Sequence, residues 1–266
     1  MPLAVCATPI GNLDDVTLRV LAELREADVV LAEDTRHTRG LLDRHGIEAR
    51  LLSYHEHNEA ARVAEFVPRL LRGERIALVS DAGLPGISDP GARIVRAAVD
   101  AGIVVSVLPG PSAVQTALVV SGLLSERYCF VGFLPRRAGE RSALWAELAQ
   151  WAWPAVAFES AQRLPASLRS LAESDPDRDV VVCRELTKRF EEVVRGSAVE
   201  LATRFAEAPK GEITLVIGPG AAASESSLAS EAVAELVAAG TPRRVAADVV
   251  SRLTDTSRNA LYRGSL

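Results

Sequence analysis

The sequence predicts an α/β protein with two α/β domains and a small helical appendage at its C-terminal end. Strand-like apolar runs alternate with helical patterns from the first residues onward. Glycine- and proline-rich loops directly follow two of the strand-like runs, where a strand must turn toward a helix. The 266 residues, 48% of them hydrophobic, suffice for one large or two medium domains.

The first domain is expected to cover residues 1–121 and to contain a mainly parallel sheet. Its alternation of strand-like and helical segments is the βαβ rhythm of such a sheet. The expected strands are 3–7, 28–32, a run ending at Ser80, and 103–108, and the expected helices are 16–26, one from 38, 58–72, one after Pro90, and 112–121.

The second domain is expected over residues 122–220, with the domain boundary near 120–127. Its expected strands are 128–133, 155–158, 180–183 and 213–217, and its expected helices are 142–151, 164–172 and 198–206. Residues 219–227 are small and polar, which predicts a linker. The appendage follows as a helical tail over 228–266, with short helices at 231–239 and 243–253.

Composition and charge exclude several classes of protein. No window holds about 18 uninterrupted apolar residues, and the N-terminus has no basic region before an apolar stretch, so we expect a cytoplasmic protein without a membrane span. The cysteines, Cys6, Cys129 and Cys183, lie far apart, which predicts neither a disulfide nor zinc. A net charge of −5 argues against a protein that coats nucleic acid nonspecifically.

Two loops predict a ligand site at one edge of the first sheet. Residues 80–91 follow the apolar run 76–79, and residues 108–112 follow the next run. Ligands of open α/β sheets collect outside the carboxyl ends of the strands, so the two loops predict a cleft, although each alone is also compatible with an ordinary turn. The first loop, 8–15, has a single glycine, which disfavours a dinucleotide pyrophosphate, and no triphosphate-binding motif occurs in the chain.

Charged clusters at strand ends supply candidate chemistry. Residues 33–39 hold two carboxylates, two guanidinium groups and an imidazole, a density typical of a site; the alternative is a solvated helix start whose acids face the helix dipole. His55 and His57 have the spacing of two metal ligands, but without a third we favour polar loop residues or substrate contacts. Charged groups also flank the strands of the second domain, at 158–160, 184–188 and 210–212, where structural ion pairs are the alternative.

Ten short motifs are distributed over nearly the whole chain. They are TPIGNL at 8–13, EDTRHT at 33–38, HNE at 57–59, SDAG at 80–83, ISDPG at 87–91, LPGP at 108–111, GFLP at 132–135, RELTK at 184–188, KGE at 210–212 and NALY at 259–262. Together they resemble the ribosomal RNA small subunit methyltransferase I family. Two positions depart from the pattern: Leu84 stands where threonine is usual, and Ala161-Gln162 where proline and histidine often follow FES.

The resemblance implies a tetrapyrrole methylase fold, with S-adenosylmethionine in a cleft between two α/β domains. It also implies a homodimer that methylates the ribose 2′-hydroxyl of a decoding-centre cytidine in 16S rRNA, within the small ribosomal subunit. Because the cofactor has no phosphates, loops that offer backbone donors and acceptors suit it. In-line positioning of the ribose oxygen should supply most of the acceleration, with a general base adding about 10²- to 10⁴-fold.

The motifs carry the expected site residues. The candidates for the general base are Glu33, Asp34 and His37. The expected cofactor-binding residues are Pro9, Gly11, Asp81, Gly83, Pro85, Gly110, Ser112, Ala113, Phe158, Glu159, Gly211 and Glu212. The expected RNA-binding residues are Arg36, Arg39, His57, Arg136, Arg137, Arg141, Arg243 and Arg258. No metal is expected.

Two rival functions and the role of the tail are open at this point. A tetrapyrrole methylase is disfavoured by the first loop, since such enzymes carry a glycine-rich loop there, and a noncatalytic RNA-binding assembly factor has no need of a cofactor cleft. From Thr241 onward the chain contains five arginines and two aspartates, and this positive net charge predicts an RNA-facing module. The alternative is a brace that packs on the body through Val245, Val249, Val250 and Leu253.

Overall fold

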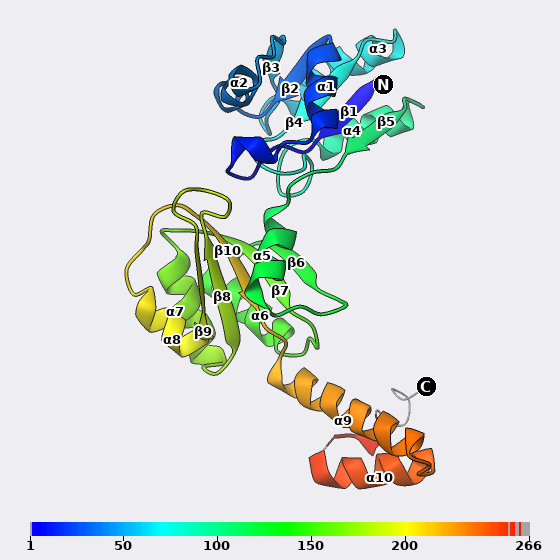
Figure 1. Ribbon diagram of the computed structural model, residues 1–266, viewed down its shortest axis with the longest axis vertical. Coiled ribbons are helices and arrows are strands. Elements are labelled where there is room, and N and C mark those ends of the chain that lie inside the picture. The colour runs from blue at the N-terminus through cyan, green and yellow to red at the C-terminus, as the bar shows by residue number, and fades with distance from the viewer. Residues whose placement is uncertain (1, 255, 259–260, 262–266) are drawn as a thin grey trace. The chain divides into compact units, whose positions relative to one another are not determined.

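A computed structural model describes residues 2–254, 256–258 and 261 of the chain, without the side chains of 221–227. The chain divides into two compact units (Figure 1). Unit 1 comprises residues 1–116 together with the separate segment 185–191, and unit 2 comprises 117–184 and 192–266. Unit 1 is therefore discontinuous in sequence.

Unit 1 contains a five-stranded parallel sheet. The strand order is β3 (Leu51–Ser53), β2 (Val29–Ala32), β4 (Ile76–Val79), β1 (Leu3–Cys6) and β5 (Val105–Leu108). The central strands are buried along their whole length, which explains why they read as continuous apolar runs. The prediction of a mainly parallel sheet is confirmed, and β3, which the sequence analysis missed, lies at its edge.

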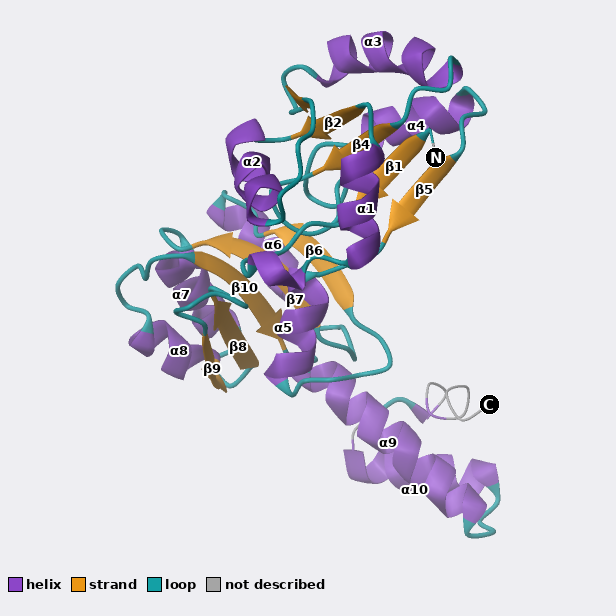
Figure 2. Ribbon diagram, turned by 45° about the horizontal axis from the view of Figure 1, so that its top comes forward, coloured by secondary structure: helices purple, strands orange, loops and turns teal. Residues whose placement is uncertain are grey.

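Helices cover both faces of this sheet (Figure 2). Leu3 and Val5 point to a core built with α3 (Glu59–Leu71) and α4 (Ala92–Asp100). Ala4 and Cys6 point to the opposite core, built with α1 (Leu18–Glu26) and α2 (Thr35–Arg44). This alternation is the period of two expected of a strand. Because helices cover both faces, only the ends of the sheet are open to ligands.

Unit 2 contains a mixed five-stranded sheet. Its order is β6 (Cys129–Phe133), β7 (Ala155–Ser160), β10 (Glu212–Ile217), β8 (Asp179–Arg184) and β9 (Glu192–Ser197), and only the β6–β7 pair is parallel. One face packs on α6 (Ala138–Leu148), α7 (Leu164–Ser174) and α8 (Ala198–Arg204). Helix α5 (Ala113–Ser121) spans the boundary between the units. Strand β9, like β3, had not been predicted.

The tail forms a helical hairpin with its own small core. Helix α9 (Ala221–Ala238) and helix α10 (Arg243–Thr254) enclose Ala229, Val233, Ala246, Ala247, Val250 and Leu261. The linker predicted over 219–227 is wrong for most of its length, because α9 begins at Ala221. Small residues had suggested flexibility there, but alanine is the best helix former, and neither proline nor glycine interrupts 221–238.

The apolar side chains of α10 differ in exposure, and several residues of the tail lie outside the described part of the chain. Val250 packs inside the hairpin, whereas Leu253 is 80% exposed and Val245 50% exposed. Asp255, Asn259, Ala260, Tyr262 and Arg263 lie outside the described residues. Within the described part of the chain, no helix is long and apolar enough to cross a membrane.

Candidate active site

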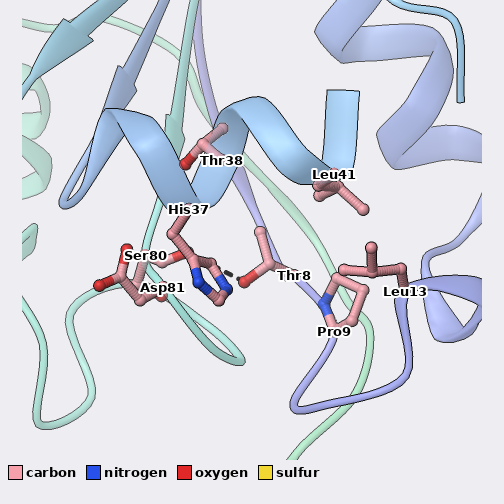
Figure 3. Close-up of a pocket in the computed structure, with 8 residues that line it drawn as sticks. All are labelled: Thr8, Pro9, Leu13, His37, Thr38, Leu41, Ser80 and Asp81. Atoms are coloured by element: carbon pink, nitrogen blue, oxygen red, sulfur yellow. Dashed lines mark hydrogen bonds between the residues drawn. The ribbon is translucent and has the colours of Figure 1, made fainter. Parts of the chain in front are cut away.

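A pocket opens at the carboxyl ends of β1, β2 and β4 in unit 1 (Figure 3). Its lining residues are Thr8, Pro9, Leu13, His37, Thr38, Leu41, Ser80 and Asp81. The pocket is small and partly open to solvent.

Hydrogen bonds join the loops after β1 and β4. The N–H of Thr8 donates to the carbonyl of Gly83 at 2.8 Å, and the N–H of Gly83 returns a bond to the carbonyl of Thr8 at 3.1 Å. The Thr8 hydroxyl donates to the carbonyl of Ser80 at 3.0 Å, the dashed line in Figure 3. Gly83 has a φ of 74°, which glycine adopts without steric cost. These bonds fix the two loops against each other.

The start of α2 fixes the candidate acids. Asp34 is the N-cap of α2, and its carboxylate also accepts from the Arg36 guanidinium at 2.9 Å, which lowers the pKa of Asp34 to about 2. Its backbone N–H donates to Asp81 Oδ1 at 3.0 Å. The helix-start alternative is therefore correct for Asp34. An acid with so low a pKa is a weak proton acceptor, so Asp34 is the least suitable of the candidate bases.

Three carboxyl groups influence one another at this sheet edge. Burial, and next the charge of Asp81, raise the pKa of Glu33. Burial, and next the charge of Glu33, raise the pKa of Asp89 to about 6. Asp89 was not among the predicted site residues, although it lies in the ISDPG motif. The repulsion between these neighbouring negative charges would be relieved by a cation, such as the sulfonium or ammonium group of S-adenosylmethionine.

The loop after β5 also approaches the end of β1 closely. A Cβ on Gly110, after β5, would lie 2.9 Å from the Cβ of Ala7, so only glycine permits this approach. Ser112, which follows, accepts from the N–H of Gln115 at 3.4 Å, and Ala113 begins α5. Pro85 is buried, and Leu84 packs against one of the two cores of unit 1. The Leu84 side chain therefore contributes to the hydrophobic packing of unit 1.

The histidine pair after β3 belongs to a hydrogen-bonded loop. The Asn58 side chain accepts from the N–H of His55 at 2.9 Å and donates to the carbonyl of Ser53 at 3.1 Å. Glu59 accepts from the N–H of Gly91 at 3.0 Å, and His57 is exposed. In the described residues no three histidine, cysteine, aspartate or glutamate side chains are grouped to hold a metal ion.

The loop after β1 is supported by segment 185–191 of unit 1. A Cβ on Gly11 would lie 2.5 Å from Lys188 Cγ and 2.8 Å from the carbonyl oxygen of Leu186. The N–H of Asn12 donates to the Thr187 hydroxyl at 3.0 Å. Residues of the RELTK motif thus lie directly against Gly11. The expected binding of the cofactor by Gly11 stays a prediction.

The expected cofactor residues of unit 2 lie on β7 and near the start of β10. The carboxylate of Glu159 is buried and accepts from Ser167 Oγ at 2.6 Å, from its neighbour's N–H at 2.7 Å and from Arg163 at 2.5 Å. The ring of Phe158 packs edge-on against the rings of Phe130 and Phe133. Gly211, with φ 102°, and Glu212 lead into β10. Glu159 thus has structural partners, and binding of the cofactor by this group stays a prediction.

The expected RNA-binding residues differ in exposure. Exposed side chains belong to Arg36, Arg39, His57, Arg136, Arg137 and Arg258, while Arg243 is partly exposed. Arg258 forms an ion pair with Asp248 at 2.8 Å. Arg141 is only 9% exposed and its Nε is buried without a hydrogen-bond partner, so it is not part of an exposed basic surface. Its place inside α6, one helical turn after Arg137, explains why sequence proximity misled the prediction.

Comparisons with known proteins define the class. The family model for tetrapyrrole (corrin/porphyrin) methylases matches residues 2–202. Among the solved structures that share the fold, the methyltransferase CobJ has a TM-score of 0.63 and 18% identity, over 82% of this chain and 94% of that one. Uroporphyrin-III-C-methyltransferase from Thermus thermophilus has a TM-score of 0.57 and 20% identity, over 81% of this chain and 93% of that one. The chain is thus a methyltransferase with the tetrapyrrole methylase fold, a class that uses S-adenosylmethionine as methyl donor.

Curated relatives narrow the class further. Ribosomal RNA small subunit methyltransferase I from Mesorhizobium japonicum is 43% identical over 264 residues, 98% of this chain and 90% of the relative. The protein of the same name from Mycobacterium tuberculosis is 47% identical over 241 residues, 90% of this chain and 85% of the relative. This chain belongs to the ribosomal RNA small subunit methyltransferase I family.

Proposed function

We propose that this chain transfers the methyl group of S-adenosylmethionine to the ribose 2′-hydroxyl of a decoding-centre cytidine in 16S rRNA. The resemblance to rRNA methyltransferases over almost the full chain is the observation that carries the proposal. It includes the tail, because 264 aligned residues extend far beyond residue 202, where the match to the tetrapyrrole methylase model ends. The proposal includes a homodimer that acts in the cytoplasm on the small ribosomal subunit.

His37 and Glu33 are the residues we propose for proton removal. The His37 imidazole lies in the pocket beside Thr8 and Asp81 (Figure 3). Geometry comes before pKa in the choice of a general base, which favours His37 as the group that takes the proton of the ribose hydroxyl. Glu33 is the second candidate, because its raised pKa makes it a better proton acceptor than Asp34.

Methyl transfer from labelled S-adenosylmethionine to small subunits that lack the modification tests the proposal. Ribose methylation predicts one missing band in an alkaline-hydrolysis ladder of the product, because cleavage requires a free 2′-oxygen. Methyl incorporation with an unbroken ladder would exclude ribose methylation. Methylation of corrin or porphyrin precursors instead would identify a tetrapyrrole methylase, and binding of RNA without binding of cofactor would identify an assembly factor.

Single substitutions test the assignments within the pocket. We expect His37→Gln or Glu33→Gln to lower kcat by about 10²-fold or more. The affinity for S-adenosylmethionine should change little, since a base acts in the transition state. Glu48→Gln, an exposed carboxylate beyond α2, is the matched control. Asp81→Ala should weaken cofactor binding, and an unchanged dissociation constant would exclude its cofactor role.

The tail is proposed to contact rRNA phosphates through its arginines. Truncation after Ala223 should preserve cofactor affinity, lower methylation of small subunits and flatten the dependence on salt concentration, since arginine contacts to phosphate release counterions. Unchanged turnover and salt dependence would exclude this role. Loss of folding would support the brace alternative.

A further inference from the structure

Segment 185–191 of unit 1 contains two residues with a left-handed backbone. Glu185 has a φ of 53° and Thr187 a φ of 64°. A β-branched residue such as threonine is a real outlier at a positive φ, because its Cβ substituents crowd the backbone. Strained residues of this kind persist only where surrounding contacts hold them, and they cluster at functional sites.

Hydrogen bonds inside the segment hold this conformation. The N–H of Thr187 donates to Glu191 Oε2 at 2.5 Å. The N–H of Lys188 donates to the carbonyl of Glu185 at 3.0 Å, and the N–H of Glu191 donates to the carbonyl of Lys188 at 3.1 Å. The segment is thus a closed turn, and Leu186 anchors it with a side chain that is 7% exposed.

The strained residue meets the middle of the loop that follows β1. The Thr187 Oγ1 accepts from the N–H of Asn12 at 3.0 Å. It would also lie only 2.7 Å from a Cβ on Gly11, so the absence of a side chain at position 11 makes the approach possible. Pro9 and Leu13, which flank these two residues, both line the pocket.

The far end of the same loop is fixed by α2. Arg44 forms an ion pair with Asp14 at 2.9 Å, and His45 Nε2 lies 3.2 Å from the carbonyl oxygen of Leu13. The loop is therefore held by α2 at one end and by Thr187 in its middle.

We propose that Thr187 is a positioning residue: its left-handed backbone aims the hydroxyl at the Asn12 N–H and so holds the wall formed by Pro9 and Leu13 in the shape that binds the methyl donor. This inference rests on the proposed function only in taking the pocket as part of the donor site. A glycine or asparagine would adopt the same φ at lower cost. A glycine, however, has no side-chain acceptor for the Asn12 N–H, whereas the threonine hydroxyl provides one.

Three variants separate positioning from a merely structural role. Thr187→Gly relieves the strained φ and removes the acceptor, Thr187→Val keeps the branched shape and removes the acceptor, and Thr187→Ser keeps the acceptor. We expect calorimetry to show S-adenosylmethionine binding about tenfold more weakly for the glycine and valine variants and within about twofold of the parent for the serine variant. The melting temperature of the glycine variant should equal or exceed that of the parent.

Hydrogen exchange at the Asn12 amide provides a second measurement. Exchange should accelerate in the valine and glycine variants and stay slow in the serine variant, because only serine retains an acceptor. Wild-type cofactor affinity in both the glycine and the valine variants would overturn the proposal, as would a serine variant as weak as valine. If the Thr187→Val variant fails to fold, the comparison of the Thr187→Gly and Thr187→Ser variants decides whether Thr187 is a positioning residue.

Failure of this inference differs from failure of the proposed function. A parent protein that binds S-adenosylmethionine but leaves small subunits unmethylated contradicts the rRNA substrate, while the calorimetric comparison of the three variants still decides the role of Thr187. A parent that methylates small subunits, with variants that bind the donor as the parent does, contradicts only the inference.

Discussion

Replacement of Asp89 by asparagine should stabilise the protein in a pH-dependent way. The folded environment raises the pKa of Asp89 from its ordinary 3.8 to about 6. At 1.36 kcal/mol for each tenfold change in acidity, this difference corresponds to roughly 3 kcal/mol. Because the side chain is partly exposed, solvent screening should reduce the effect to about half, on the order of 1.5 kcal/mol.

The sign follows from proton binding. Between about pH 4 and pH 6 the folded protein holds a proton on Asp89 that the unfolded chain has released, so the free energy of unfolding falls as pH rises through this window. Asparagine has no proton to lose. The variant should therefore match the parent near pH 4 and unfold about 3–6 °C higher above pH 6.5.

Thermal unfolding followed by circular dichroism from pH 4 to pH 8 measures this difference. Asp100→Asn, which alters a surface aspartate paired with Arg96 on α4, is the control and should stay within about 1 °C of the parent at every pH. A gap between Asp89→Asn and the parent that does not change with pH would refute the reasoning. So would a variant less stable than the parent at pH 8.

Three further predictions concern packing and reactivity. Gly110→Ala should cost about 1–3 kcal/mol in urea denaturation, because its Cβ would lie 2.9 Å from the end of β1, whereas Gly139→Ala in α6 meets nothing within 4 Å and should be neutral or stabilising. Glu159→Gln should cost about 2–3 kcal/mol in the same assay, because it leaves an arginine without its buried partner; a loss below about 0.5 kcal/mol would contradict this. Iodoacetamide at pH 8 should modify Cys129 ahead of Cys6, since burial raises the pKa of Cys6 to about 12, and equal rates would exclude that protection.

The central strands of both sheets were predictable because burial on two faces produces uninterrupted apolar runs. Edge strands lack that signal. Strand β3 has only three residues, all partly exposed, and β9 contains Glu192, Arg195 and Gly196, residues that blunt an exposed edge. Helix α2 starts at Thr35, three residues before its expected position, because the polar residues taken for a loop follow an N-cap at Asp34.

Much of the pocket was predictable because the carboxyl ends of parallel strands meet at one edge, which brings Pro9, His37 and Asp81 together. Thr187 escaped sequence reasoning. It lies 175 positions from its partner Asn12, and its role depends on a backbone angle that no composition or period reveals. Asp89 escaped because its acidity is set by burial and neighbouring charges rather than by its motif.

The discontinuity of unit 1 affects the order in which the protein matures during its synthesis. Residues 1–116 leave the ribosome first, but segment 185–191 is completed only after roughly 75 more residues, about 4–15 s later at about 5–20 residues per second. During that interval the loop after β1 lacks the hydroxyl that Thr187 gives it. A nascent chain stalled before residue 185 would therefore contain all five strands of the parallel sheet without the segment that supports the loop after β1, and the wall that we propose to bind the methyl donor is completed only when most of the polypeptide has been made.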